Sequence, residues 1–150
     1  GPMPWRRWWR RGPAAPPDAR LVLTASYDGT ARLWCTRTGE CLREYAGHDD
    51  NVMSAIFSED GTHVLTAAYD GVAKLWCAAT AACLQTFVGE EGGLYTAAFS
   101  PDASRVLTAS AEGCARLWRV DSGECEWTLQ GHGGCYMRSA AFSPDGKQVT

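Results

Sequence analysis

The sequence predicts an all-β protein built from small antiparallel sheets that pack side by side. The segment 23–34 returns as 65–76 and again as 107–118, each time after 42 residues. Within each period the apolar residues occur in short runs that end at turn signals instead of continuing with helical spacing. A repeat of this length cannot bury its own apolar faces, so neighbouring copies must stack to form a core.

Each repeat is expected to contain four strands joined by short turns. In the central repeat these strands are predicted at residues 52–57, 64–68, 72–76 and 82–87. Aspartate–glycine pairs between the runs supply the positive-φ glycine that tight reversals need. Where the central repeat has Asp60-Gly61, the next repeat has Asp102-Ala103. Alanine is strained in a left-handed turn, so this hairpin is predicted to have the weakest turn.

The charge distribution separates the first 20 residues from the rest of the chain. They hold five arginines and one aspartate, which gives them a net charge of +4. The whole chain has a net charge of −3, so the residues after position 20 together carry −7. A mildly acidic body lacks the clustered cations that nucleic-acid binding requires, so no nucleic-acid partner is expected. No apolar stretch approaches the length of a membrane span or signal-peptide core, which predicts a cytoplasmic or other intracellular protein.

Residues 1–19 are expected to form an extension, and residues 20–150 the repeat domain. Gly1-Pro2 before Met3 resembles the remnant of a cleaved tag. A tryptophan–arginine cluster at residues 5–11 then precedes a proline-rich run. Three interpretations are open: a disordered leader, a segment that adheres to membranes or nucleic acid, and an arm that docks on the acidic body.

The seven cysteines follow the repeat more than any redox or metal motif. Cys35 and Cys77 are equivalent, as are Cys41, Cys83 and Cys125. A disulfide across the turn between Cys35 and Cys41 is geometrically conceivable, but reduced thiols are expected because the total is odd and no leader sequence is present. No CxxC pair or metal-ligand histidine spacing occurs, so neither a metal nor another cofactor is predicted.

Three short motifs recur along the chain. Gly-His dipeptides occur at 47–48 and 131–132, Phe-Ser-x-Asp-Gly turns at 57–61 and 142–146, and Leu-Trp pairs at 33–34, 75–76 and 117–118. With these motifs, residues 20–150 resemble the WD-repeat family of β-propellers. Two features depart from the family pattern: Cys35, Cys77 or Arg119 follows the tryptophan in place of aspartate, and Glu90 replaces the histidine of one repeat. The resemblance implies propeller blades of four antiparallel strands, with about three blades per chain.

It also implies a buried hydrogen-bond network in each blade, linking histidine, threonine, aspartate and the tryptophan indole. The complete set here is expected to be His48, Thr66, Asp70 and Trp76. The next set, Thr108, Glu112 and Trp118 with Glu90, places two carboxylates where one belongs, so a looser and partly solvated network is predicted. Thr24, Asp28 and Trp34 lack an upstream histidine, and His132 lacks its downstream partners.

These incomplete ends predict self-association. Three blades are too few to close a ring, and open sheet edges favour pairing with further copies. We expect the first strand of a blade at about 136–142 to pair with residues 21–45 of a second copy. A dimer would have six blades and a trimer nine, and the dimer is favoured because nine exceeds the usual range. The alternative is that the chain is a fragment of a longer propeller.

The predicted function is that of a non-catalytic scaffold for protein–protein interactions. WD-repeat proteins bind partners on the face that carries the loops between strands two and three and between successive blades. The residues expected on that face are Tyr27, Tyr69, Asp49, Asp50, Asn51, Glu90, Glu91 and Tyr136. Acidic groups beside tyrosine favour a basic or amphipathic segment. Two alternatives are a purely structural self-assembling repeat without a partner and, more distantly, an enzyme using His48 with Asp70 and Thr66. The catalytic alternative is declined, because a satisfied structural network explains all three residues and also their repeat register.

Overall fold

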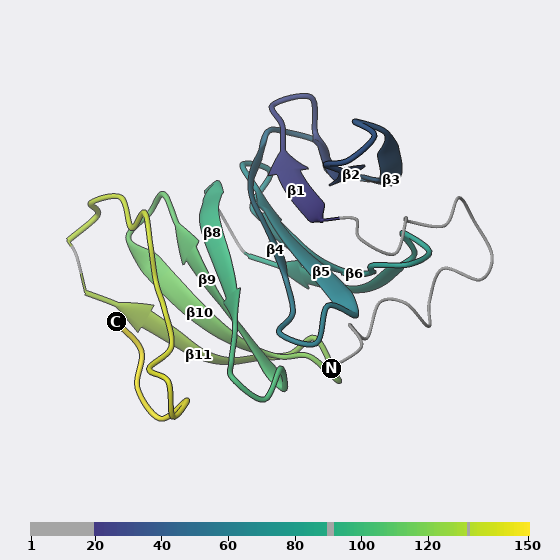
Figure 1. The fold of residues 1–150 in the computed structure, drawn as a ribbon. Coiled ribbons are helices and arrows are strands. Elements are labelled where there is room, and N and C mark those ends of the chain that lie inside the picture. Colours follow the sequence, from purple (N-terminus) through teal and green to yellow (C-terminus); the bar gives the residue numbers. More distant parts are fainter. Residues whose placement is uncertain (1–19, 90–91, 132) are drawn as a thin grey trace.

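The computed structural model describes residues 20–89, 92–131 and 133–150, which fold into three antiparallel sheets side by side (Figure 1). In each sheet the strands are hydrogen-bonded in chain order. The first sheet comprises β1 (Leu21–Ala25), β2 (Thr30–Cys35) and β3 (Cys41–Ala46); the second β4 (Val52–Phe57), β5 (His63–Ala68), β6 (Val72–Cys77) and β7 (Cys83–Val88); the third β8 (Leu94–Phe99), β9 (Arg105–Ser110), β10 (Cys114–Arg119) and β11 (Cys125–Gln130). The prediction of an all-β fold made of propeller-type blades is confirmed. In the described part of the chain, no helix has the length and apolarity that crossing a membrane demands.

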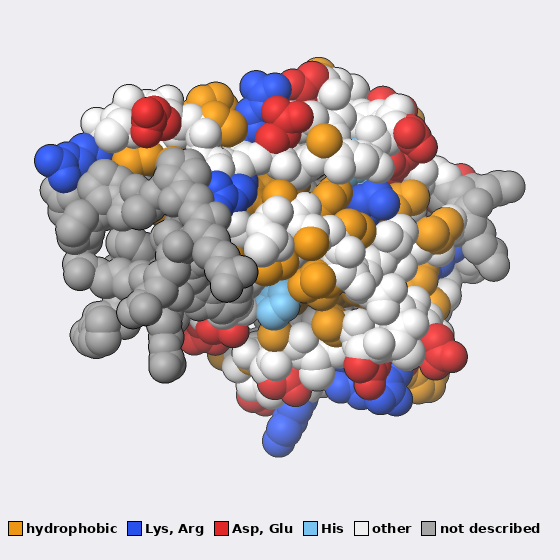
Figure 2. All heavy atoms as spheres, turned by 90° about the vertical axis from the view of Figure 1, so that its right-hand side faces the viewer, with side chains coloured by type: hydrophobic (Ala, Val, Ile, Leu, Met, Phe, Trp, Pro, Cys, Tyr) orange, Lys and Arg blue, Asp and Glu red, His pale blue; other side chains and the backbone are white. Residues whose placement is uncertain are grey.

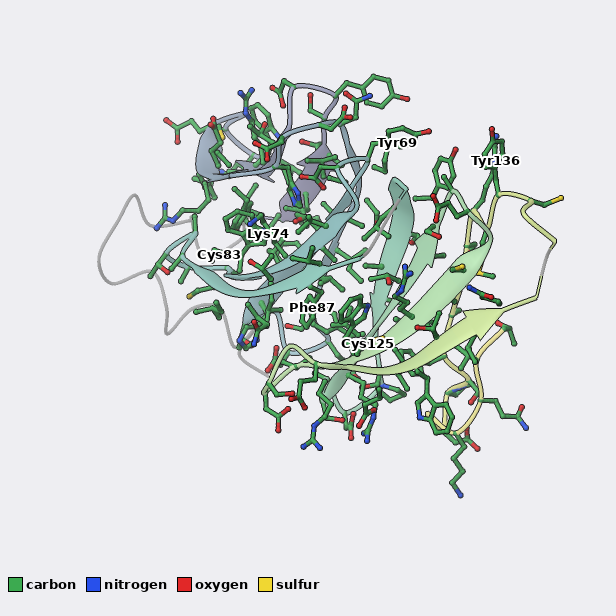
Figure 3. All side chains as sticks on the ribbon, turned by 180° about the vertical axis from the view of Figure 1, so that it is seen from behind. Tyr69, Lys74, Cys83, Phe87, Cys125 and Tyr136 are labelled. Carbon is green, nitrogen blue, oxygen red and sulfur yellow. The ribbon has the colours of Figure 1, made fainter. Side chains whose placement is uncertain are left out.

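The core lies between the sheets, as expected for a repeat that cannot bury its own faces. Tyr45 of the first sheet contacts Trp76 of the second with ring centroids 5.9 Å apart, and Phe87 of the second contacts Trp118 of the third at the same distance. Tyr45 and Phe87 are completely buried. Phe87 is seen between the second and third sheets in Figure 3. Each seam therefore buries one large aromatic pair from equivalent positions of the repeat.

The segment after β11 differs from the prediction of a strand at residues 136–142. Its backbone makes a single antiparallel bridge, between Phe142 and Val149. The segment still lies where the inner strand of a fourth sheet would lie: the Met137 N–H donates to the Ser110 carbonyl at 3.1 Å, and Ala140 is buried against the third sheet. The predicted strand fails to form because the inner strand of a sheet needs the next strand as its partner, and only Val149 and Thr150 pair with it.

The turns between the first two strands of each blade have the predicted geometry. Gly61 has φ 71°, and Ala103 adopts φ 56° at the equivalent place. The Ser100 hydroxyl donates to the Asp102 carboxylate at 2.7 Å, and the Ser104 N–H donates to the same carboxylate at 3.1 Å. These bonds hold Ala103 in a region that side chains disfavour.

The seven cysteines are free thiols in the structure. Cys35 is buried in the seam between the first and second sheets, whereas Cys41 is exposed. The two residues flank one turn, but only the first faces the core.

Candidate functional site

Four side chains of the second blade meet in one hydrogen-bonded chain. The His48 ring contacts the Asp70 carboxylate through Nδ1 at 3.0 Å and the Thr66 hydroxyl through Nε2 at 2.7 Å. The Trp76 indole N–H donates to the same hydroxyl at 2.9 Å. His48 precedes β4, Thr66 lies in β5, and Asp70 lies in the turn before β6, which carries Trp76. The network therefore joins the loop between two blades to β5, to β6 and to the turn that connects them.

The bonds determine the protonation of His48. A carboxylate only accepts, so Nδ1 carries the proton and Nε2 accepts from Thr66. Burial lowers the pKa of His48, and this outweighs the opposing effect of the hydrogen bond and charge of Asp70. The imidazole is therefore neutral near pH 7.

The same geometry decides what these residues can do chemically. A histidine between a carboxylate and a hydroxyl is the arrangement of a catalytic triad. Here Thr66 has no exposed surface, and His48 is 9% exposed. The Thr66 oxygen also accepts the Trp76 indole N–H at 2.9 Å, and Asp70 accepts the Asp49 and Val72 N–H groups at 3.0 Å each. The hydrogen bonds of His48, Thr66 and Asp70 therefore hold the loop in place. The Thr66 hydroxyl is buried and inaccessible to a substrate.

In the other two predicted sets, the described residues form only the threonine–tryptophan bond of the expected network. The indole N–H of Trp118 donates to Thr108 at 3.0 Å, and that of Trp34 to Thr24 at 2.8 Å. Asp28 bonds within its own turn, to Thr30 at 2.7 Å, which is the main cause of its lowered pKa.

Glu112 is exposed and makes no hydrogen bond to the Thr108–Trp118 pair. The expected partners Glu90 and His132, together with Glu91 of the binding face and the whole 1–19 extension, lie outside the described residues. The looser network around two carboxylates stays a prediction.

Residues of the expected binding face gather where the loop before β4 meets the turn after β5. The Asp49 N–H is bonded to Asp70, and the Asn51 carbonyl accepts the Tyr69 N–H at 2.8 Å. The Asp50 carboxylate accepts the N–H of Asn51 at 2.8 Å and remains exposed. These backbone bonds fix the loop, so its outward side chains stand on a rigid base.

Tyr69 and Tyr136 lie at the same end of the molecule in Figure 3. Tyr95 joins them: its ring centroid is 6.0 Å from that of Tyr69 and 6.1 Å from that of Tyr136, both in edge-to-face geometry. Tyr95 is chiefly responsible for raising the pKa of the Tyr69 phenol, and burial adds to the effect. Tyr27 is 74% exposed in the equivalent turn of the first blade, and the described contacts do not include it in this group.

Sequence reasoning missed Tyr95 and Arg138, whose guanidinium carbon lies 6.0 Å from the Tyr95 ring centroid. One observation could have pointed to Tyr95: it is the second residue of β8, close to the loop that precedes this strand. The residue pattern alone presented it as an ordinary strand residue.

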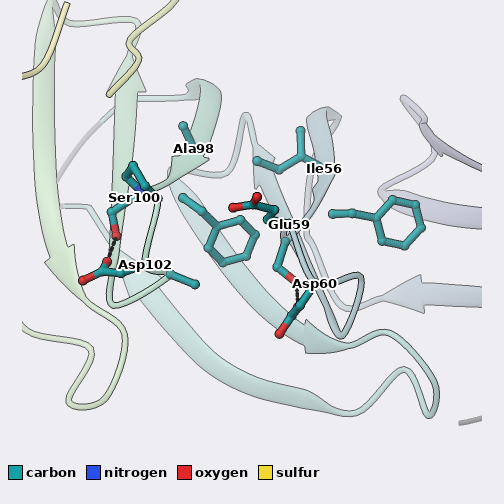
Figure 4. Close-up of a pocket in the computed structure, with 11 residues that line it drawn as sticks. Ile56, Glu59, Asp60, Ala98, Ser100 and Asp102 are labelled. Carbon is teal, nitrogen blue, oxygen red and sulfur yellow. Dashed lines mark hydrogen bonds between the residues drawn. The ribbon is translucent and has the colours of Figure 1, made fainter. Parts of the chain in front are cut away.

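The opposite side of the molecule has a hollow of about 670 Å³ between the second and third sheets (Figure 4). Glu59, Asp60 and Asp102 line it, and the two aspartates each accept a serine hydroxyl of their own turn, at 2.6 and 2.7 Å. These bonds, from Ser58 and Ser100, are the largest cause of the lowering of both pKa values to about 2. Both groups are fully ionised near pH 7 and serve the turns, so they make poor general acids. Among the described residues no group of three His, Cys, Asp or Glu could hold a metal ion.

Stacked antiparallel sheets of three or four strands, repeated along the chain, define a repeat protein of the β-propeller class. The chain belongs to the WD-repeat family: the family model described as "WD domain, G-beta repeat" matches residues 14–35, 39–77, 81–119 and 123–150.

Several known proteins resemble one repeat's length of the chain. A probable E3 ubiquitin ligase complex SCF subunit sconB of Emericella nidulans is 49% identical over 43 residues, covering 29% of this chain and 6% of that protein. Human WD repeat-containing protein 86 is 50% identical over 36 residues, or 24% of this chain and 10% of that protein. A sconB protein of Talaromyces marneffei is 50% identical over 40 residues, covering 27% and 6%. The matched part is thus a small fraction of each relative.

Proposed function

We propose that the protein is a non-catalytic, intracellular scaffold that binds protein partners through its loop face and assembles with copies of itself. One observation carries the binding proposal: exposed tyrosines and carboxylates gather on the loop face, while the buried histidine and threonine and the half-buried aspartate that resemble a catalytic set belong to a structural network. Exposed aromatic side chains on a rigid base are typical of recognition surfaces. The neighbouring acids Asp49 and Asp50 favour a basic or amphipathic segment.

The family supports this proposal. Family membership suggests protein partners, and the sconB relatives are named as subunits of a multi-protein complex. We expect protein segments, rather than nucleic acid, cofactor or membrane, to occupy the loop face.

Replacing Tyr27 and Tyr69 together by alanine tests the loop face. Tyr27 is 74% and Tyr69 43% exposed, so the double variant should keep its fold and mass while binding captured partner proteins at least tenfold more weakly. Leu84→Ala is the matched control, because Leu84 is 51% exposed near the start of β7, outside the loop face. Unchanged partner binding in the double variant would show that the face is wrongly assigned.

The two ends of the array support self-assembly. Leu129 occupies in the third sheet the position of the buried Tyr45 and Phe87, yet it is 43% exposed. Trp34 occupies in the first sheet the position of Trp76 and Trp118, which are 3% and 5% exposed, and it is only half-buried. Hydrophobic side chains are exposed on the side of the molecule that Figure 2 shows. Among the described residues, each end of the array therefore exposes a seam residue whose counterpart lies at the other end.

Head-to-tail contact would place Leu129 of one copy against Trp34 of the next, repeating the internal seams. A closed dimer gives six blades and a closed trimer nine, and we favour the dimer because rings of four to eight blades are usual. In the closed ring β1 of the second copy takes the place beside residues 136–142, where Val149 and Thr150 now pair.

The mass in solution tests this assembly. We expect twice the 16.3 kDa chain mass by light scattering, and a chain lacking residues 147–150 should associate more tightly. Leu129→Glu should dissociate the assembly, whereas Leu84→Glu, at a residue 51% exposed on β7, should leave it intact. A stable monomer at micromolar concentration would disprove the assembly. Assembly without any partner that depends on Tyr27 and Tyr69 would favour a purely structural repeat.

A further inference from the structure

Three tyrosines from successive repeats form a continuous aromatic surface on the loop face. This tyrosine cluster consists of Tyr69, Tyr95 and Tyr136, with neighbouring centroids 6.0 and 6.1 Å apart. Tyr69 is 43% and Tyr136 66% exposed, while Tyr95 between them is half-buried. The two outer rings, Tyr69 and Tyr136, therefore expose π surface to solvent, and Tyr95 packs between them.

The cluster is held in place by backbone packing. A Cβ atom on Gly93 would lie within 3 Å of three atoms of the Tyr69 ring, so the ring lies directly against the glycine. The Tyr69 N–H is bonded to the Asn51 carbonyl at 2.8 Å. A ring fixed in this way loses little conformational entropy when a ligand binds to it.

The cluster already accommodates one cation. The guanidinium of Arg138 lies over the Tyr95 ring, 6.0 Å from its centroid. The exposed carboxylate of Asp50 acts electrostatically on Tyr69, which adds negative potential on that side. Aromatic faces attract guanidinium groups, which are planar and more weakly hydrated than ammonium.

We propose that the partner inserts an arginine side chain against the tyrosine cluster, with its guanidinium on the exposed rings of Tyr69 and Tyr136. The inference rests on the proposed function, since it names the partner chemistry of that same face. Arg138 of the chain itself is then a competitor: it covers Tyr95 and repels an incoming cation. A lysine would bind more weakly, because an ammonium cannot stack flat on a ring.

Selection of a displayed random peptide library against the whole protein tests the proposal. Peptides that bind the wild type and are lost on Tyr69→Ala/Tyr136→Ala should share an arginine. Replacing that arginine by citrulline, which is planar but uncharged, should weaken binding about tenfold, and by lysine about threefold.

Two single substitutions sharpen the test. Gly93→Ala displaces the Tyr69 ring without changing a charge and should weaken the arginine peptide about threefold. Gly131→Ala, where a Cβ meets nothing within 4 Å, is its matched control. Arg138→Gln should tighten binding about threefold, whereas Arg119→Gln, which breaks an exposed ion pair with Asp121, should not.

The outcomes separate the two proposals. Peptides that require the tyrosines but contain no arginine, or tolerate citrulline, would overturn the arginine inference and leave the scaffold function standing. Peptides that all bind independently of Tyr27, Tyr69 and Tyr136 would overturn both.

Discussion

The two internal seams share their apolar contact and differ in their polar one. Tyr45–Trp76 and Phe87–Trp118 each place ring centroids 5.9 Å apart. Only the second blade adds His48 and Asp70 to its threonine–tryptophan pair, as the described residues show. The aromatic pair is therefore the contact that the two seams have in common. The histidine and aspartate have a separate effect, because they tie the loop before β4 to the second sheet.

The largest effect should come from deleting the shared apolar contact. Phe87→Ala and Tyr45→Ala should each lower the free energy of unfolding by about 3–5 kcal/mol, because both side chains are fully buried. Urea denaturation at matched protein concentration measures this. If either variant lost less than Thr66→Val, the polar network rather than the aromatic pair would dominate the seam.

Removing the threonine should destabilise the second blade more than the third. Thr66→Val leaves the His48 Nε2 atom and the Trp76 indole N–H without a partner, while His48 keeps its bond to Asp70, and it should cost about 2–3 kcal/mol. Thr108→Val leaves only the Trp118 indole and should cost about 1 kcal/mol. Equal losses in urea denaturation would mean that His48 adds nothing to stability.

The turns offer a smaller comparison between the same blades. Ala103→Gly should raise the free energy of unfolding by about 1 kcal/mol, since Ala103 has φ 56°. Gly61→Ala, at φ 71°, should lower it by a similar amount. Melting temperatures of the two variants should shift in opposite directions, and a shift in the same direction would contradict the strain at Ala103.

The smallest effect is a pH dependence specific to the second blade. The pKa of His48 is lowered by folding, so the unfolded chain binds a proton that the folded chain resists. Its contribution is fully present above the ordinary histidine pKa of about 6.5 and is lost as pH falls below that value. Unfolding free energies at pH 7.5 and 5.0 should differ less in His48→Gln than in the wild type. His63→Gln controls for loss of a histidine outside the network, and an unchanged difference in His48→Gln would exclude this role.

The repeat period and the turn residues determined the architecture in advance. The 42-residue spacing and the runs around Thr66 and Trp76 predict strand existence, order and stacking, because alternation and turn chemistry are local properties. The set of His48, Thr66, Asp70 and Trp76 also came from sequence, through resemblance to a repeat family. The failure at residues 136–142 has a physical cause: a strand forms only with a partner, and pairing is not a local property.

The sequence by itself determined the repeating sheets, their order and the chemical groups carried on their loops. Only the tertiary structure decided which of the tyrosines on the loop face contact one another. Tyr69, Tyr95 and Tyr136 are far apart along the chain, and their rings come within 6.0 and 6.1 Å only because the sheets stack in a fixed register. It also decided that Phe87 is buried while Leu129, at the same repeat position, is 43% exposed. Burial depends on whether a neighbouring sheet covers the residue, and no single repeat contains that information.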